Sequence, residues 1–244
     1  SIGRSKHSLS EGNALSSMIM AKNRKRFFSA LYAVIFATFI VEALGTILIY
    51  MELPYSEFPD NLSRFIFAMF HAVSAFCNAG FSTFSSNLMD YNGNTVVIIS
   101  IGLDIILGGL GFLTLTELFS NKTFKLKKLW KALTIHSRLV LIVTAILIFS
   151  GMLLFLVIEY DGILKTMPLK EKLLASFFQS VTARTAGFNS VDIGALQEGT
   201  CLMLIVLMFI GGSPGSIAGG VKTSTVAVLY IYLISRLKGL RQIV

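Results

Sequence analysis

The chain has 244 residues, of which 54% are hydrophobic and only 14% are charged. Roughly a quarter of the residues of a soluble globular domain are charged, so this composition excludes such a domain and predicts a polytopic membrane protein. The formal net charge of +8 does not predict a nucleic-acid partner, because the basic residues gather in segments between apolar runs. The two cysteines, Cys77 and Cys201, form no motif typical of a disulfide or a metal site.

The first half of the chain predicts a basic segment followed by one pore-forming repeat. Residues 27–51 form an apolar run of 25 residues, which is long enough to span a bilayer. A short apolar helix and a polar, glycine-containing strand follow within 64–82, and a second predicted span covers 94–118. We therefore expect a cytoplasmic basic segment at 1–26 and a first repeat at 27–118. In this repeat, M1 and M2 denote the spanning helices before and after the pore helix and filter.

The second half repeats this layout. An apolar run at 139–158 predicts a third span, and a short helix with a second polar strand lies within 169–189. The last apolar segment, 200–235, is interrupted by glycines. The predicted fold class is an all-α polytopic membrane protein with two M1–pore-helix–filter–M2 repeats, the second M2 being broken by a Gly-rich loop. The expected boundaries are 119–138 for a cytoplasmic basic linker, 139–236 for the second repeat and 237–244 for a cytoplasmic tail.

Two short stretches indicate an internal duplication. When Gly80 is placed on Gly187, an offset of 107 residues, an unbroken Ala-Gly-Phe coincides, and each copy follows a short apolar run. The matching residues of the first copy are Leu62, Ala68, Phe70, Ala79, Gly80 and Phe81. A helix too short to span, followed by non-helical backbone, is typical of a re-entrant pore loop, because such backbone survives at membrane depth only inside protein or beside water.

We interpret both copies as ion-selectivity filters. Glycine adopts backbone angles that are closed to other residues, so neighbouring carbonyl groups can point inward and replace the hydration shell of a cation. The carbonyl end of each short helix also favours a cation. The alternative is that Ala-Gly-Phe forms a small-residue contact between membrane helices. The expected filter residues are Asn78, Ala79, Gly80, Phe81, Thr185, Ala186, Gly187 and Phe188.

The last apolar segment carries five glycines and a proline within 211–220. A regular helix cannot continue through that composition. The eleven residues of 200–210 reach only about 16 Å as a helix, so we expect the loop halfway across the bilayer, beneath the second filter, where it acts as a gate. The stretch after Gly215 resembles a nucleotide-binding P-loop, but it has one residue too many before Lys222 and no preceding strand. The expected gate residues are Gly211, Gly212, Ser213, Pro214, Gly215, Ser216, Ala218, Gly219, Gly220 and Lys222.

Several ionisable residues lie in or near apolar segments, where charges are costly and commonly functional. Arg184, beside the second filter, is expected to pair with Glu42 or Asp104 and to brace the filter loop. Lys222 marks the cytoplasmic end of the broken span or extends its ammonium group to the membrane surface. His71, on the first pore helix, is expected to be packed rather than functional.

The basic and acidic residues occupy alternate segments. Most of the 21 Lys and Arg residues lie in 1–26, 119–138 and the C-terminal tail, which the positive-inside rule places in the cytoplasm. Most of the acidic residues lie in the opposite loops. They would concentrate cations at an outer mouth, or they are ordinary solvated loop charges.

Three stretches together resemble the Trk/Ktr/HKT family of potassium transporters: VSAFCNAGFST (73–83), TARTAGFNSV (182–191) and GGSPGSIAGGVKTST (211–225). The resemblance, which is to a Ktr-type membrane subunit, covers essentially the whole chain. It implies four M1–pore–M2 repeats around one pore, with Gly80 and Gly187 as the second and third filter glycines and the Gly-rich loop as the gate. It also implies a multi-pass protein of the cell inner (plasma) membrane that forms a homodimer, binds a cytosolic nucleotide-binding regulatory subunit and transports K⁺ or Na⁺, with no other cofactor.

Only two of those four repeats are found here. The chain has no initiator Met and no signal peptide, which favours a fragment. Because the two copies match specific, non-equivalent repeats of the family, we expect that the first and fourth repeats are absent from this sequence; the alternative is that two chains build one pore. The predicted function is transport of a monovalent cation, potassium above all, through a gated pore. The alternative is a sodium-selective or sodium-coupled carrier with alternating access. No Ser/His/Asp, metal-ligand or paired-carboxylate pattern predicts an enzyme.

Overall fold

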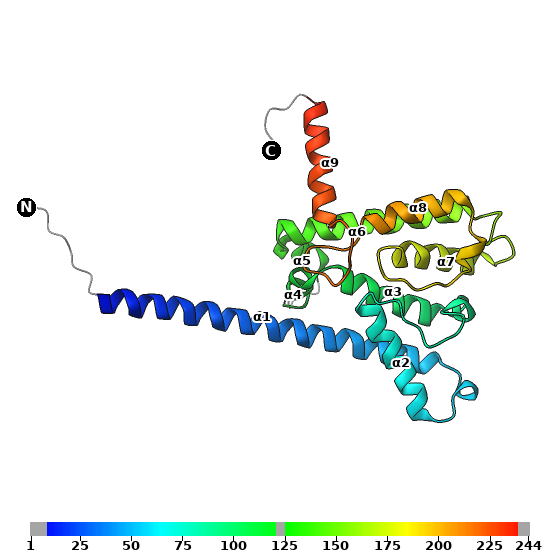
Figure 1. Ribbon diagram of the computed structural model, residues 1–244, viewed down its shortest axis with the longest axis horizontal. Helices are drawn as coiled ribbons and strands as arrows, with labels where there is room; N and C mark the ends of the chain where they lie inside the picture. Colours follow the sequence, from blue (N-terminus) through cyan, green and yellow to red (C-terminus); the bar gives the residue numbers. More distant parts are fainter. Residues whose placement is uncertain (1–8, 121–124, 239–244) are drawn as a thin grey trace, which may run out of the picture.

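The structure is a computed structural model that describes residues 9–120 and 125–238. Over these residues the chain is built of α-helices, short 3-10 turns and irregular loops, and it forms no sheet (Figure 1). The predicted all-α class is confirmed. The helices are α1 (Leu9–Glu52), α2 (Asn61–Phe76), α3 (Thr95–Gly109), α4 (Phe112–Ser120), α5 (Leu126–Ala132), α6 (Ile135–Ile158), α7 (Leu169–Thr182), α8 (Glu198–Phe209) and α9 (Thr223–Leu237).

Two helices in the described part of the chain are long and apolar enough to cross a membrane unaided. They are the second part of α1, Leu31–Glu52, and α6, with 22 and 24 residues, or roughly 33 and 36 Å at helical rise. Large apolar side chains such as Phe36, Phe39 and Phe149 are exposed on them, as expected of helices that face lipid. The N-terminal part of α1 extends well beyond the other helices (Figure 1).

The segment predicted as one continuous span at 94–118 is instead two helices. α3 and α4 are bent by 110° at the break between them. Asn94 caps α3, because its side-chain oxygen accepts hydrogen bonds from two backbone N–H groups of the first turn. Gly111, just before α4, has a φ of +82°, a left-handed conformation that ends a helix and that glycine adopts most readily. The expectation of an unbroken M2 in the first repeat was therefore wrong.

The two predicted pore helices are α2 and α7, with 16 and 14 residues. Asp60 caps α2 by accepting a hydrogen bond from the backbone N–H of Ser63 at 2.6 Å. Hydrogen bonding from Ser63 lowers the pKa of Asp60, which keeps a negative charge at the positive end of the helix. Arg64 lies between the rings of Tyr50 and Tyr55, 4.3 and 3.8 Å from their centroids, and so ties α2 to the end of α1.

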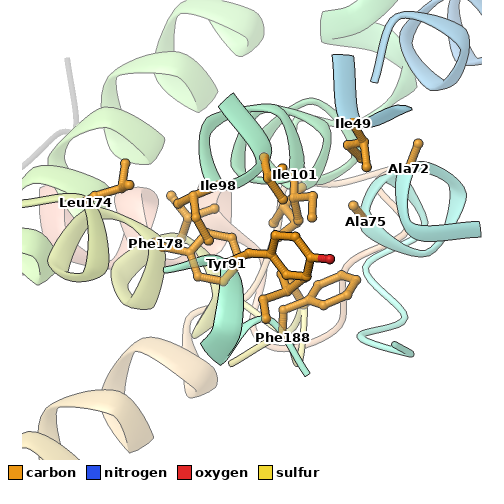
Figure 2. Packing of buried hydrophobic residues seen from close by; sticks show 14 of the residues in the cluster. Ile49, Ala72, Ala75, Tyr91, Ile98, Ile101, Leu174, Phe178 and Phe188 are labelled. Carbon is orange, nitrogen blue, oxygen red and sulfur yellow. The ribbon is translucent and has the colours of Figure 1, made fainter. Parts of the chain in front are cut away.

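α3 lies against both pore helices and carries the largest apolar cluster (Figure 2). Ile98 of α3 and Phe178 of α7 are fully buried in it. Ala72 and Ala75 of α2 pack on the same cluster, and their small size lets α2 approach α3 closely. Phe188, the residue after the second predicted filter glycine, also belongs to it. Apolar packing between the two repeats therefore fixes the position of the second filter strand.

Candidate ion pathway

The backbone angles of the two predicted filters repeat at the same offset as their sequences. Asn78 and Gly80 have φ of +49° and +70°, and Thr185 and Gly187 have φ of +69° and +84°. Only one other non-glycine residue of the described chain, Asn87, has a positive φ, so this coincidence supports the internal duplication. Left-handed residues at alternate positions turn successive peptide groups toward one side of a strand. A filter lined by carbonyl oxygens requires that arrangement.

The two filter strands touch at their glycines. A Cβ placed on Gly80 would lie 2.7 Å from the Cα of Gly187, and a Cβ placed on Gly187 would lie 3.3 Å from the Cα of Gly80. Non-bonded carbon atoms prefer a separation of about 3.5–4.0 Å. The close approach therefore leaves no room for a side chain at Gly80 and little at Gly187.

A hydroxyl group near the end of each pore helix holds the filter that follows it. Ser74 Oγ donates to the carbonyl oxygen of Phe81 at 2.8 Å. In the second repeat, Thr182 Oγ1 donates to the carbonyl oxygen of Phe188 at 2.8 Å and accepts from its N–H at 2.9 Å. Sequence analysis did not predict these braces. The signal that could have found them is a hydroxyl residue six or seven positions before the phenylalanine of each Ala-Gly-Phe.

His71 is packed, as predicted. It is 1% exposed, and its two ring nitrogens lie 2.8 Å from the carbonyl oxygen of Phe67 and 2.9 Å from Ser82 Oγ. Its ring stacks on Phe84 with centroids 4.9 Å apart. Because Ser82 directly follows the first predicted filter, His71 supports the end of that strand.

Predicted filter residues of both repeats border one cavity of about 470 Å³. Leu204 and Met208 of α8 also line it. Gly80 adjoins the cavity through its contact with Gly187. The structure thus brings together filter residues that are about a hundred positions apart in the chain. Six of the eight predicted filter residues line the cavity: Asn78, Ala79, Thr185, Ala186, Gly187 and Phe188.

The chain between α8 and α9 folds back on itself as a compact loop. At its neck, the N–H of Gly211 donates to the carbonyl oxygen of Val221, and the N–H of Gly212 donates to that of Gly219, both at 3.2 Å. A Cβ on Gly211 would overlap the carbonyl group of Gly219, so the neck can close only around glycine. The predicted break in the last apolar segment is present in the structure.

This loop is held against the break between α3 and α4. The N–H of Ser213 donates to the carbonyl oxygen of Gly109 at 2.9 Å, and the N–H of Phe112 donates to that of Gly215 at 3.1 Å. A Cβ on Gly111 would lie 2.5 Å from a carbonyl oxygen of the loop. Sequence analysis missed this partner because the glycines before α4 were taken as part of a continuous helix. Three glycines in four residues were the available signal.

The loop is also held against the second filter. Nη2 of Arg184 donates to the carbonyl oxygen of Gly211 at 3.3 Å, and the N–H of Gly219 donates to Thr185 Oγ1 at 3.1 Å. Arg184 is 5% exposed. The expectation that Arg184 pairs with Glu42 or Asp104 was therefore wrong, because the guanidinium group of Arg184 donates to a backbone carbonyl of the Gly-rich loop.

Two acidic residues that lie within apolar segments of the first repeat, Glu42 of α1 and Asp104 of α3, are near each other. Asp104 is 4% exposed, and its carboxyl group occupies the space beside Gly45, where a Cβ would overlap it. Glu42 is close enough for its charge to act on Asp104. In the second repeat, Nζ of Lys222 donates to the carbonyl oxygen of Ala218 at 2.7 Å. Lys222 thus closes the end of the Gly-rich loop that it was predicted to border.

Known proteins resemble the chain over most of its length. The family model described as "TrkH: Cation transport protein" matches residues 1–242. The Ktr system potassium uptake protein B of Bacillus subtilis is 41% identical over 179 residues, covering 72% of this chain and 39% of that protein. The potassium/sodium uptake protein NtpJ of Enterococcus hirae is 40% identical over 174 residues, covering 71% and 37%. The crystal structure of the potassium transporter TrkH from Vibrio parahaemolyticus matches with a TM-score of 0.66 and 19% identity, over 92% of this chain and 44% of that one.

These similarities differ in what they establish. At 19% identity, the match to the crystal structure shows the fold alone, and it agrees with the all-α membrane architecture. The chain spans about two fifths of the length of the two relatives named above. The family model covers nearly the whole chain, and the Trk/Ktr resemblance predicted from the sequence is confirmed. The chain therefore belongs to the TrkH family of cation transport proteins, which are ion transporters and not enzymes.

Proposed function

We propose that this chain forms part of a gated pore that conducts a monovalent cation, potassium above all, across a membrane. The observation that carries the proposal is a matched pair of strands, in which left-handed residues recur at 78, 80, 185 and 187 and the two glycines touch. The names of two relatives, a potassium uptake protein and a potassium/sodium uptake protein, agree with this substrate class.

In this proposal the carbonyl groups of 78–81 and 185–188 replace water around the cation. Each filter begins at the C-terminal end of a pore helix, α2 or α7. The helix dipole places partial negative charge there, which lowers the free energy of a dehydrated cation. Two of the four filter strands expected in the family come from this chain. The other two filter strands would come from regions that correspond to the parts of the relatives outside the matched segments.

The Gly-rich loop at 211–220 is the proposed gate. It begins just after α8 ends, and Gly219, near its other end, contacts Thr185 of the proposed second filter. Its hydrogen bonds to Gly109, Phe112, Arg184 and Thr185 hold it in one place. Those bonds are few; two of the four join neutral backbone groups and contribute about 1 kcal/mol each, and the bond from the charged Arg184 contributes more. A displacement of the loop is therefore within reach of a regulatory partner, and it would clear the path beneath the filter.

The proposed setting is a bilayer, with the chain as a multi-pass component of the cell inner membrane. The basic segments 1–26 and 119–138 and the C-terminal tail would be cytoplasmic. By family resemblance, we also propose a homodimer and a cytosolic nucleotide-binding regulatory subunit; a relative is named as part of a Ktr system. A cysteine placed at Lys127, which is exposed, should react with an impermeant thiol reagent only from the cytoplasmic side. Labelling of Lys127→Cys from outside would refute this topology.

A second candidate is a sodium-selective or sodium-coupled carrier with alternating access. The observation that favours it is that both M2 segments are broken, the first by a 110° bend and the second by the loop between α8 and α9. Broken helices at the membrane midplane form the ion sites of many carriers. The sodium in the name of one relative agrees with that substrate.

Ion flux through the full-length transporter in liposomes separates the two candidates. A pore should carry a current that follows the K⁺ gradient and should lose its preference for K⁺ over Na⁺ in Gly187→Ser. A carrier should show slow flux that requires a Na⁺ gradient. Gly199→Ala is the matched control, because a Cβ on Gly199 would meet only Ile158 Cγ2 at 3.8 Å. Strictly Na⁺-dependent flux, or an unchanged preference in Gly187→Ser, would refute the proposed pore.

A further inference from the structure

We propose that Arg184 and Thr185 are positioning residues that couple the Gly-rich loop to the second filter, so that opening of the loop changes the geometry of that filter. The inference rests on the proposed function, since it assigns the loop as gate and 185–188 as filter. The inference goes beyond the proposed function because it makes ion selectivity dependent on whether the gate is open or closed.

Two consecutive residues of the filter strand hold the two ends of the loop. The guanidinium group of Arg184 donates to Gly211, the first residue of the loop, at 3.3 Å. The hydroxyl oxygen of Thr185 accepts from the N–H of Gly219, near its last residue, at 3.1 Å. The loop cannot leave the filter without breaking both bonds, or else moving the filter residues with it.

The burial of Arg184 makes the first of these bonds costly to lose. Arg184 is 5% exposed, and its Nε has no hydrogen-bond partner in the described part of the chain. Departure of Gly211 would remove the acceptor of Nη2 and leave a buried guanidinium group with even fewer partners. Arg184 is therefore expected to shift when the loop moves, in search of another acceptor.

A shift of Arg184 reaches the filter through a backbone held in an uncommon conformation. Thr185, the next residue, has a φ of +69° although it is β-branched, and Gly187 lies two residues further on. A β-branched residue adopts that angle only where surrounding contacts hold it. The hydrogen bond from Gly219 is one of those contacts. Its loss releases Thr185 toward common backbone angles, and the peptide groups that follow turn with it.

The first filter lacks this connection, although its backbone angles are the same. At the same offset, Arg184 corresponds to Cys77 and Thr185 corresponds to Asn78. The side-chain oxygen and nitrogen of Asn78 are buried and have no hydrogen-bond partner among the described residues. The coupling is therefore one-sided: loop movement deforms the second filter directly and the first only through the contact at Gly80.

The test uses the full-length transporter in liposomes and measures basal flux and the K⁺/Na⁺ permeability ratio. Arg184→Gln and Thr185→Val should each raise basal flux by about fivefold or more, the low end of typical coupling between two sites, and should lower the permeability ratio. Thr185→Val should do so more than Thr185→Ser, which keeps the acceptor oxygen. Cys77→Ser, at the corresponding position of the first repeat, is the control and should leave both quantities unchanged.

A double-mutant cycle with the loop decides the outcome. Deletion of 211–219 removes Gly211 and Gly219, the loop partners of Arg184 and Thr185, so Arg184→Gln should have no further effect on flux in that background. If Arg184→Gln changes flux by the same factor with and without the loop, Arg184 acts on the filter alone and the coupling is refuted. The same refutation follows if neither Arg184→Gln nor Thr185→Val changes flux in the intact protein. If the loop is not a gate, the deletion alone leaves flux unchanged, and this result distinguishes failure of the proposed function from failure of the coupling.

Discussion

The two filter loops have the same backbone but different surroundings. Asn78 and Gly80 repeat the left-handed angles of Thr185 and Gly187, and a hydroxyl group braces the phenylalanine after each glycine. Behind the first filter, the side chain of Asn78 makes no hydrogen bond among the described residues. Behind the second, Arg184 and Thr185 hold the Gly-rich loop. The two similar stretches therefore share their backbone geometry and differ in the segments that contact them.

The M2 segments differ in the same way. In the first repeat the break is only two residues long, between the end of α3 at Gly109 and the start of α4 at Phe112. In the second, thirteen residues separate α8 from α9. A two-residue bend re-aims a helix but leaves no segment free to move, whereas thirteen residues form a loop with its own hydrogen bonds. The comparison teaches that the left-handed strand is common to both repeats, whereas a long loop, the proposed gate, is found only in the second.

The largest expected effect comes from placing a side chain at the contact between the filters. Gly80→Ala and Gly187→Ala should both lower the K⁺/Na⁺ permeability ratio, because a left-handed φ alone costs a non-glycine residue about 1–2 kcal/mol. Gly80→Ala should be the more severe, since its Cβ would overlap the carbonyl oxygen of Ala186, whereas a Cβ on Gly187 would lie 3.3 Å from the Cα of Gly80. The measurement is the reversal potential in mixed K⁺ and Na⁺, with Gly199→Ala as control. A milder phenotype for Gly80→Ala would show that the strands separate in the complete pore.

The next effect concerns the loop that only the second repeat has. Deletion of 213–219 should raise basal flux by about tenfold or more, equivalent to ~1.4 kcal/mol of lost closed-state stability, while the K⁺/Na⁺ preference is reduced rather than abolished. Any regulation by a cytosolic partner should weaken in parallel. Tracer uptake by the full-length protein, normalised to the amount inserted in the membrane, measures it. Unchanged or lower flux would show that the loop serves packing rather than gating, and the two repeats would then not differ in gating.

Features of the fold could be predicted from the sequence where a backbone conformation requires one particular residue type. Glycine is the residue of left-handed strands and close backbone contacts, so Gly80 and Gly187 could be found from a repeated tripeptide. The clustered glycines of 211–220 predicted a broken helix for the same reason. The partners of these segments could not be found, because backbone carbonyls carry no sequence signature. The binding of Arg184 to the carbonyl oxygen of Gly211, rather than to an acidic residue, is a choice that only the tertiary arrangement determines.

A smaller effect tests whether the first M2 break serves the gate. Gly111→Ala should raise basal flux about two- to fivefold, because the φ of +82° disfavours alanine and the new Cβ would lie 2.5 Å from the carbonyl oxygen of Pro214. The substitution would displace the loop from the α3–α4 break but would leave the loop in the chain. Gly109→Ala is the control, since nothing lies within 4 Å of its Cβ position. Equal flux in the two variants would mean that the loop does not depend on its contact with the α3–α4 break.

The smallest effect comes from the hydroxyl braces, where the two repeats differ by a single hydrogen bond. Among the described residues, Ser74 Oγ donates to the carbonyl oxygen of Phe81, whereas Thr182 Oγ1 donates to the carbonyl oxygen of Phe188 and also accepts from its N–H. A buried hydrogen bond contributes about 1 kcal/mol, and a donor left without a partner adds to that cost. Thr182→Val, which keeps the shape of the side chain, should therefore lower the K⁺/Na⁺ permeability ratio and the unfolding temperature more than Ser74→Ala does.

Comparison with Thr182→Ser isolates the hydrogen bonds from the methyl group. If Thr182→Ser retains most of the selectivity that Thr182→Val loses, the hydroxyl group is the brace. If Ser74→Ala is as damaging as Thr182→Val, the second hydrogen bond adds nothing. The stronger fixation of the second filter would then come from the burial of Phe188 in the apolar core between α3 and α7, which no change at Thr182 would alter.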